Sequence, residues 1–94
     1  MQFVVTAFDY KDALERRLEH REAHLNGLRA MAKQGTFISG GAMVNDQGKM
    51  IGSNVHVAFP DLAAVQAWLD SDPFTVHKVW ETTTIREIKL LTID

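Results

Sequence analysis

A histidine and an aspartate, far apart in the chain, are the residues best suited to chemistry. His24 lies in a segment of helical character, and Asp72 comes much later, directly before Pro73 and Phe74. A carboxylate that accepts a hydrogen bond from one imidazole nitrogen leaves the other nitrogen free to take up a proton near neutral pH. We therefore predict a His24–Asp72 dyad for general acid–base catalysis. The pair indicates a kind of site and leaves the substrate open.

Two arginines on the same predicted helix place positive charge beside His24. At about 100° per residue, one stripe of the helix carries Arg21 where another leucine is expected, with Arg17 and His24 on its shoulder. The other members of this predicted core-facing stripe are Leu14, Leu18, Leu25, Leu28 and Ala32. We expect Arg21 to anchor a substrate carboxylate or enolate, with Arg17 close by. The structural alternative is that both arginines extend along the seam to solvent and that His24 bonds to backbone.

Other residues argue for a site without metal or cofactor. His20 and His24 have the i,i+4 spacing of a zinc pair, but two ligands are too few and the His-Glu-x-x-His order is absent. His56 alternates with valines and is expected on a sheet face. No glycine-rich phosphate loop is present, so we expect no nucleotide. Ser53 either donates a hydrogen bond to a ligand or is a plain strand-end hydroxyl.

Composition narrows the class of protein. The 94 residues are 46% hydrophobic and 23% charged, and we expect one globular domain over residues 1–94. The net charge of −2, with scattered Lys and Arg, argues against a nucleic-acid partner. No apolar run approaches the ~18 residues of a membrane span. The absence of cysteine excludes disulfides and thiol nucleophiles, and we expect a cytoplasmic protein.

The positions of these residues depend on the predicted elements. Residues 2–8 predict a strand that is apolar on both faces. A helix follows, with Asp12 as a capping-box N-cap and Gly35 as its end. Residues 36–42, with Gly40 and Gly41 closing the strand, and residues 50–59 predict a hairpin. A second helix starts at Pro60-Asp61 and ends before Ser71, and residues 82–93 predict the last strand.

The order β-α-β-β-α-β predicts a ferredoxin-like α+β fold, in which two helices cover one face of a four-stranded antiparallel sheet. The other face then has no cover, although the first strand is apolar on that side too. We therefore expect a homodimer formed through the open sheet face, giving a dimeric α+β barrel.

Three strings resemble the YCII-related (YciI-like) domain family: residues 14–25 with Arg21-x-x-His24, Gly52-Ser53, and residues 67–74 ending in Asp-Pro-Phe. The resemblance covers nearly the whole chain. It implies a dimeric ferredoxin-like fold whose site contains a His–Asp pair, here His24 and Asp72.

Further site positions follow from the same resemblance. Arg21 and Ser53 match family positions near the pocket, and Asp9 matches an acidic position after the first strand. Relatives include a dehydrochlorinase of chloroaromatic breakdown, and the muconolactone isomerases share the architecture. The chain departs from the family where Ala42 replaces a proline, where Lys78 replaces a glycine, and near Glu87, where relatives often have a proline. Because the pocket rim differs, the substrate does not carry over.

Together these observations favour a small cofactor-independent lyase or isomerase that acts on a small carboxylated substrate. His24 moves a proton, Asp72 sets its tautomer and Arg21 binds charge. The alternative is a non-catalytic ligand-binding or accessory domain in which the dyad is a structural hydrogen-bond pair, since an aspartate before proline also caps nearby N–H groups.

Overall fold

The elements follow the predicted β-α-β-β-α-β order, with one short extra helix before the last strand. The computed structural model describes residues 1–93. Its elements are β1 (Gln2–Asp9), α1 (Leu14–Gln34), β2 (Phe37–Val44), β3 (Met50–Ala58), α2 (Leu62–Ser71), α3 (Pro73–Val76) and β4 (Trp80–Glu87). Within residues 1–93, no helix combines the length and hydropathy needed to cross a membrane.

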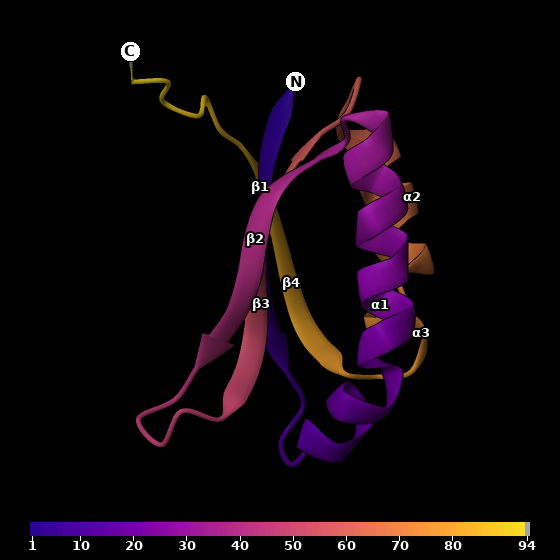
Figure 1. Ribbon diagram of the computed structural model, residues 1–94, viewed down its shortest axis with the longest axis vertical. Coiled ribbons are helices and arrows are strands. Elements are labelled where there is room, and N and C mark those ends of the chain that lie inside the picture. The colour runs from indigo at the N-terminus through magenta and orange to yellow at the C-terminus, as the bar shows by residue number, and fades with distance from the viewer. Residues whose placement is uncertain (94) are drawn as a thin grey trace.

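One antiparallel sheet in the order β2-β3-β1-β4 carries the helices on a single face. Figure 1 shows α1 lying along this face with α2 and α3 beside it, and no helix on the opposite face. The ferredoxin-like α+β prediction is therefore confirmed.

Alternation along the central strands sorts residues between the two faces. Phe3, Val5 and Ala7 of β1 are buried beneath the helices. Their β3 partners are Val57, Val55 and Ser53, in that order. The row is apolar until it reaches Ser53, which puts a buried hydroxyl at one end of the core.

The end of α1 follows the prediction and its start does not. Gly35 is left-handed (φ 81°), and its N–H bonds to the last-turn carbonyls, as glycine C-caps do. Asp12 is not the N-cap: that position is Ala13, with no side-chain cap bond, and Asp12 has φ 60°. Aspartate adopts this conformation more readily than most residues, so Asp12 forms the turn and does not cap the helix.

The buried side of α1 differs from the predicted leucine stripe. Arg17, His24 and Met31 are its buried residues, spaced seven apart and so two turns apart along one line. Leu18 is 55% exposed, and Arg21 is also exposed. The prediction failed because a helical wheel weighs hydropathy alone, whereas Arg17 and His24 are buried together with carboxylate partners from other elements.

Two strands have other limits than predicted. Gly40 and Gly41 lie inside β2 and do not end it; a Cβ at Gly40 would meet the Asn54 carbonyl oxygen at 2.8 Å, so the two strands approach closely there. β4 runs from Trp80 to Glu87, and the predicted extension to residue 93 is wrong. Within residues 1–93, β4 pairs with β1 alone, and the register between them reaches Phe3 opposite Glu87.

The face without helices is more polar than predicted from β1 alone. Phe8 is 48% exposed there and Val4 is half-buried. Between them, Thr6 accepts a hydrogen bond from the Asn54 side chain at 3.1 Å. Other polar side chains of this face are Ser39, His56, Thr82, Thr84 and Arg86. The alternation of β1 was predicted correctly, but polar side chains on the other strands make this face of the sheet partly polar.

Candidate active site

The predicted dyad partners meet between α1 and the junction of α2 with α3. His24 Nδ1 lies 2.9 Å from both carboxylate oxygens of Asp72, and both side chains are buried. The proline that follows keeps Asp72 extended (φ −64°, ψ 138°), and Asp72 Oδ1 accepts the Phe74 N–H at 2.9 Å. Because an ionised carboxylate only accepts hydrogen bonds, it selects the tautomer with the proton on Nδ1 and leaves Nε2 free.

Two aromatic rings enclose the His24 imidazole. Phe74 stacks on it at 4.1 Å between centroids, and Trp80 meets it edge-on at 5.6 Å. Such contacts fix the ring orientation and restrict water around it. Sequence reasoning gave neither aromatic a role. Trp80 reaches the site because it starts β4 opposite Asp9, at a shift in register that no local pattern signals.

A second buried polar cluster joins four elements of the fold. Arg17 of α1 makes a two-fold contact with Asp9 of β1, at 2.7 and 3.0 Å. The same guanidinium donates to Ser53 Oγ of β3 at 2.8 Å, and Trp80 Nε1 of β4 donates to that oxygen at 3.2 Å. Arg17 is only 3% exposed, so the alternative in which it extends to solvent is wrong.

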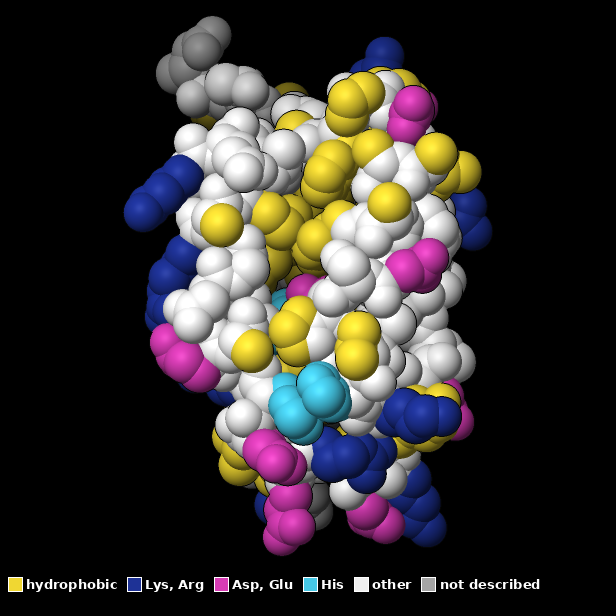
Figure 2. Space-filling model, turned by 90° about the vertical axis from the view of Figure 1, so that its right-hand side faces the viewer, with side chains coloured by type: hydrophobic (Ala, Val, Ile, Leu, Met, Phe, Trp, Pro, Cys, Tyr) yellow, Lys and Arg dark blue, Asp and Glu magenta, His cyan; other side chains and the backbone are white. Residues whose placement is uncertain are grey.

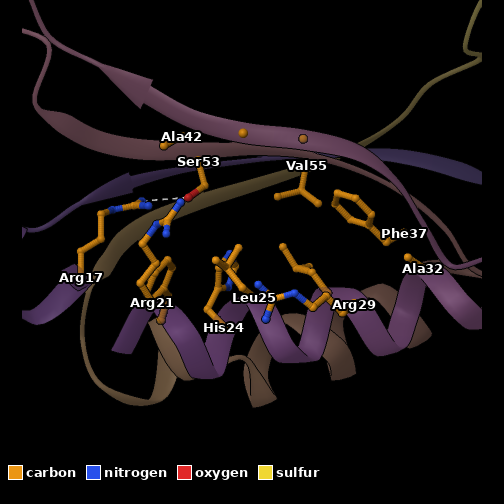
Figure 3. Close-up of a pocket in the computed structure, with 14 residues that line it drawn as sticks. Arg17, Arg21, His24, Leu25, Arg29, Ala32, Phe37, Ala42, Ser53 and Val55 are labelled. Atoms are coloured by element: carbon orange, nitrogen blue, oxygen red, sulfur yellow. Dashed lines mark hydrogen bonds between the residues drawn. The ribbon is translucent and has the colours of Figure 1, made fainter. Parts of the chain in front are cut away.

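A cavity of about 330 Å³ opens between α1 and strands β2 and β3. Figure 3 shows Arg17 and Ser53 toward one end, and Phe37 and Ala32 toward the other. The β2 wall is built of Gly40, Gly41 and Ala42, and such small residues leave the cavity room. The cavity therefore has a polar end and an apolar end.

The charge that lines the cavity is positive. Three arginines contribute to its wall, and no aspartate or glutamate among residues 1–93 lines it. Arg17 is neutralised by Asp9, and Arg29 donates to Glu22 at 2.9 Å. Arg21 has no ion pair or side-chain hydrogen bond with any residue from 1 to 93. Arg21 is thus the lining cation whose charge is left for a ligand.

The fold brings the predicted site residues together in two layers. Those that line the cavity are Arg17, Arg21, His24 and Ser53. Asp72 and Asp9 lie behind them, as the partners of His24 and Arg17. Arg21 lies at the wall as an exposed residue, where the prediction had it facing the core.

The i,i+4 pair of histidines is split between two environments. His24 is bound to Asp72, whereas the His20 ring stacks on His77 with centroids 3.7 Å apart. Figure 2 shows two histidines together on the helix-covered side. Within the part of the chain that the structure describes, no three His, Cys, Asp or Glu residues are grouped to hold a metal ion.

Comparison with known proteins gives one family match and several relatives. A model described as the YCII-related domain matches residues 1–89. Protein YciI of Escherichia coli O6:H1 is 37% identical over 95 residues, covering 95% of this chain and 97% of that protein. An uncharacterized protein of Haemophilus influenzae is 27% identical over the same shares.

Among solved structures, 5-chloro-2-hydroxyhydroquinone dehydrochlorinase from Burkholderia phenoliruptrix, in complex with 2,5-dihydroxybenzoquinone, superposes with a TM-score of 0.85. The two chains are 23% identical, and the match covers 95% of this chain and 94% of the other. At that identity the likeness is one of fold.

Proposed function

Because this chain belongs to the YCII-related domain family, we propose that it is a small cofactor-independent enzyme that transfers a proton on a carboxylated substrate. The observation that carries the proposal is the buried His24–Asp72 pair, because His24 also lines the cavity. Among residues 1–93, Arg21 is the one cation of the cavity lining without an ion-pair partner. A base and an anion anchor on one cavity are what such a reaction requires.

In the proposed mechanism, His24 Nε2 removes a proton from a carbon next to a carbonyl group. Asp72 keeps the Nδ1 proton in place and stabilises the imidazolium that forms. The protonated His24 then returns the proton at another carbon, as in an isomerase, or the carbanion expels a leaving group, as in a lyase. Arg21 binds the substrate carboxylate throughout.

The structural neighbour supports a ring-shaped substrate. The 2,5-dihydroxybenzoquinone in that structure is a flat six-membered ring that carries oxygens. The neighbouring protein is a dehydrochlorinase, and dehydrochlorination is a lyase reaction. The cavity in this chain has the apolar wall that a ring needs, contributed by Leu25, Leu28, Phe37 and Val55.

An exchange assay tests the proposal without knowledge of the natural substrate. The assay would use 4-oxocyclohexanecarboxylate, a ring ketone with a carboxylate, in D₂O. The loss of the signals of the protons next to the ketone would be followed by NMR. We expect the protein to accelerate the exchange. The Arg21→Gln variant is expected to raise KM about tenfold. This factor is at the low end of the range for a hydrogen bond to a charged group, and we choose the low end because Arg21 is exposed. Arg29→Gln, whose partner is already Glu22, serves as the matched control and is expected to change KM far less.

A second candidate function is ligand binding without catalysis. It is favoured by the Phe74 N–H bond to Asp72 Oδ1, which gives Asp72 a purely structural use as the N-cap of α3. Binding of the ring ketone with no acceleration of exchange would support this candidate and contradict proton transfer.

We also propose a homodimer formed through the open sheet face, on which Val4 and Phe8 are the apolar residues of β1. Thr6 lies between them near the centre of that face, so Thr6→Lys would bring two like charges together across a two-fold axis. We expect light scattering to give a dimer mass for the wild type and a monomer mass for Thr6→Lys. Ala67→Lys adds the same charge at an exposed position of α2 and is expected to leave the dimer intact. A wild-type monomer at micromolar concentration would contradict the dimer.

For its location we propose the cytoplasm. A chain without cysteine has no disulfide to lose in that reducing compartment.

A further inference from the structure

The Ser53 hydroxyl occupies an unusual position between two donors. Its Oγ lies 2.8 Å from Arg17 Nη2 and 3.2 Å from Trp80 Nε1. Guanidinium and indole N–H groups can only donate, so the serine oxygen is the acceptor in both bonds. A hydroxyl oxygen has two lone pairs, and both are therefore in use.

It follows that the Ser53 proton must point away from both partners. No acceptor for that proton lies within hydrogen-bond distance among residues 1–93. Ser53 lines the cavity, and Figure 3 shows its side chain directed from the sheet into the space above α1. The hydroxyl is thus a donor whose direction is set in advance and whose oxygen is polarised by a cation.

Arg17 supplies a second free donor at the same end of the cavity. Its Nε and Nη2 atoms are used by Asp9 and Ser53, whereas Nη1 has no hydrogen-bond partner in the described chain. The one side-chain nitrogen or oxygen that is both sealed from solvent and unpaired there is Thr75 Oγ1. Arg17 Nη1 is therefore not sealed, and Arg17 is one of the residues that line the cavity.

Two of the three arginines that line the cavity, Arg17 and Arg21, differ in the charge that they offer. Arg17 and Asp9 form a neutral pair, so the polar end provides hydrogen-bond donors without a full net charge. Arg21 provides the net charge. A neutral oxygen that gains charge during the reaction fits the first place, and a permanent carboxylate fits the second.

We propose that Ser53 Oγ–H and Arg17 Nη1 bind the carbonyl oxygen of the substrate, beside the carbon from which His24 removes a proton; this rests on the proposed proton transfer. The substrate class is a ring-bearing carboxylate with a ketone or enol oxygen. The carboxylate lies at Arg21 and the ketone lies at Ser53 and Arg17.

The step balances in atoms and charge. The C–H bond next to the carbonyl breaks, and its proton forms an N–H bond at His24 Nε2. The released pair forms the C=C bond of the enolate while the carbonyl π pair moves onto oxygen, where Ser53 and Arg17 donate. His24 gains one positive charge and the substrate one negative charge. Ser53 is then a donor and not a nucleophile, since both of its protein partners are donors and no hydrogen bond joins Ser53 Oγ to His24 within residues 1–93.

Two probes that differ only in the ketone test this site. 4-Oxocyclohexanecarboxylate and cyclohexanecarboxylate share the ring and the carboxylate, and isothermal titration calorimetry gives the affinity of the full chain for each. We expect the ketone to bind roughly three- to tenfold more tightly, as one or two added hydrogen bonds allow. Ser53→Ala should reduce this preference, because only Arg17 Nη1 then remains as a donor, and Ser53→Thr, which keeps the hydroxyl, should restore it. Ser39→Ala, on the opposite sheet face, is the matched control and should keep it.

The exchange assay gives a second readout. Ser53→Ala is expected to lower the exchange rate roughly 10²- to 10³-fold, as loss of an oxyanion donor does, and to affect KM much less. Equal affinity of the wild type for the two probes, or no binding of either at millimolar concentration, overturns the proposal without any variant. A preference that is unchanged in Ser53→Ala also overturns it. If the preference for the ketone depends on Ser53 but the protein does not accelerate exchange, the binding site is supported and the proton transfer is contradicted.

Discussion

Replacing His24 with alanine is expected to lower the rate of α-proton exchange by about 10²- to 10⁴-fold, the range typical of general acid–base catalysis by a side chain. Asp72→Asn should have a comparable effect for a different reason. The asparagine carbonyl can still accept the Phe74 N–H, and its NH₂ group then donates to His24 Nδ1. That arrangement moves the ring proton to Nε2, which can no longer act as a base.

The tautomer can be measured independently of the reaction. Long-range ¹⁵N–¹H correlation spectra of the wild type should place the His24 proton on Nδ1, and spectra of Asp72→Asn should place it on Nε2. His77→Ala serves as the histidine control, because His77 is exposed and outside the cavity lining, and it should exchange at the wild-type rate. Full activity in His24→Ala would show that the dyad is not the catalyst.

Removing the carboxylate of Asp9 is expected to destabilise the fold by about 3–5 kcal/mol, because Asp9→Ala leaves a buried cation without its partner. The Arg17–Asp9 contact is 2.7 Å long, and the side chains are 3% and 4% exposed. Urea unfolding followed by far-UV circular dichroism measures the loss. The double variant Asp9→Leu/Arg17→Met removes both charges and should recover most of the stability, since apolar replacements of buried pairs are often neutral or better.

The exposed pair Arg29–Glu22 is the matched control for this prediction. Its contact is 2.9 Å long, but the side chains are 58% and 72% exposed. Glu22→Ala should therefore cost about 0–1 kcal/mol, as surface ion pairs do. If Asp9→Ala costs no more than Glu22→Ala, burial of the Arg17–Asp9 pair has no energetic consequence and the cluster around Ser53 is not rigid.

Much of the fold could be predicted because local rules govern it. Alternation marks β1, glycine at φ 81° ends α1, and Asp61 caps α2 by accepting the Ala64 N–H. Strand limits could not be predicted in the same way, because they depend on the partner strand. β4 ends at Glu87, near the limit of its ladder with β1, although the residues that follow are still rich in isoleucine and leucine.

His24, Asp72 and Arg21 could be named as candidates from residue type and spacing, since each side chain carries its own chemistry wherever it lies, whereas Ser53 could be named only from the family resemblance. The sequence by itself thus determined the order of elements and the functional groups available. Only the tertiary structure decided which groups are buried and paired. Arg17 and His24 face the core because Asp9 and Asp72 reach them from other elements, and a buried charge is stable only with such a partner. Arg21 has no such carboxylate among residues 1–93 and lies exposed at the cavity wall, where its charge remains for a ligand.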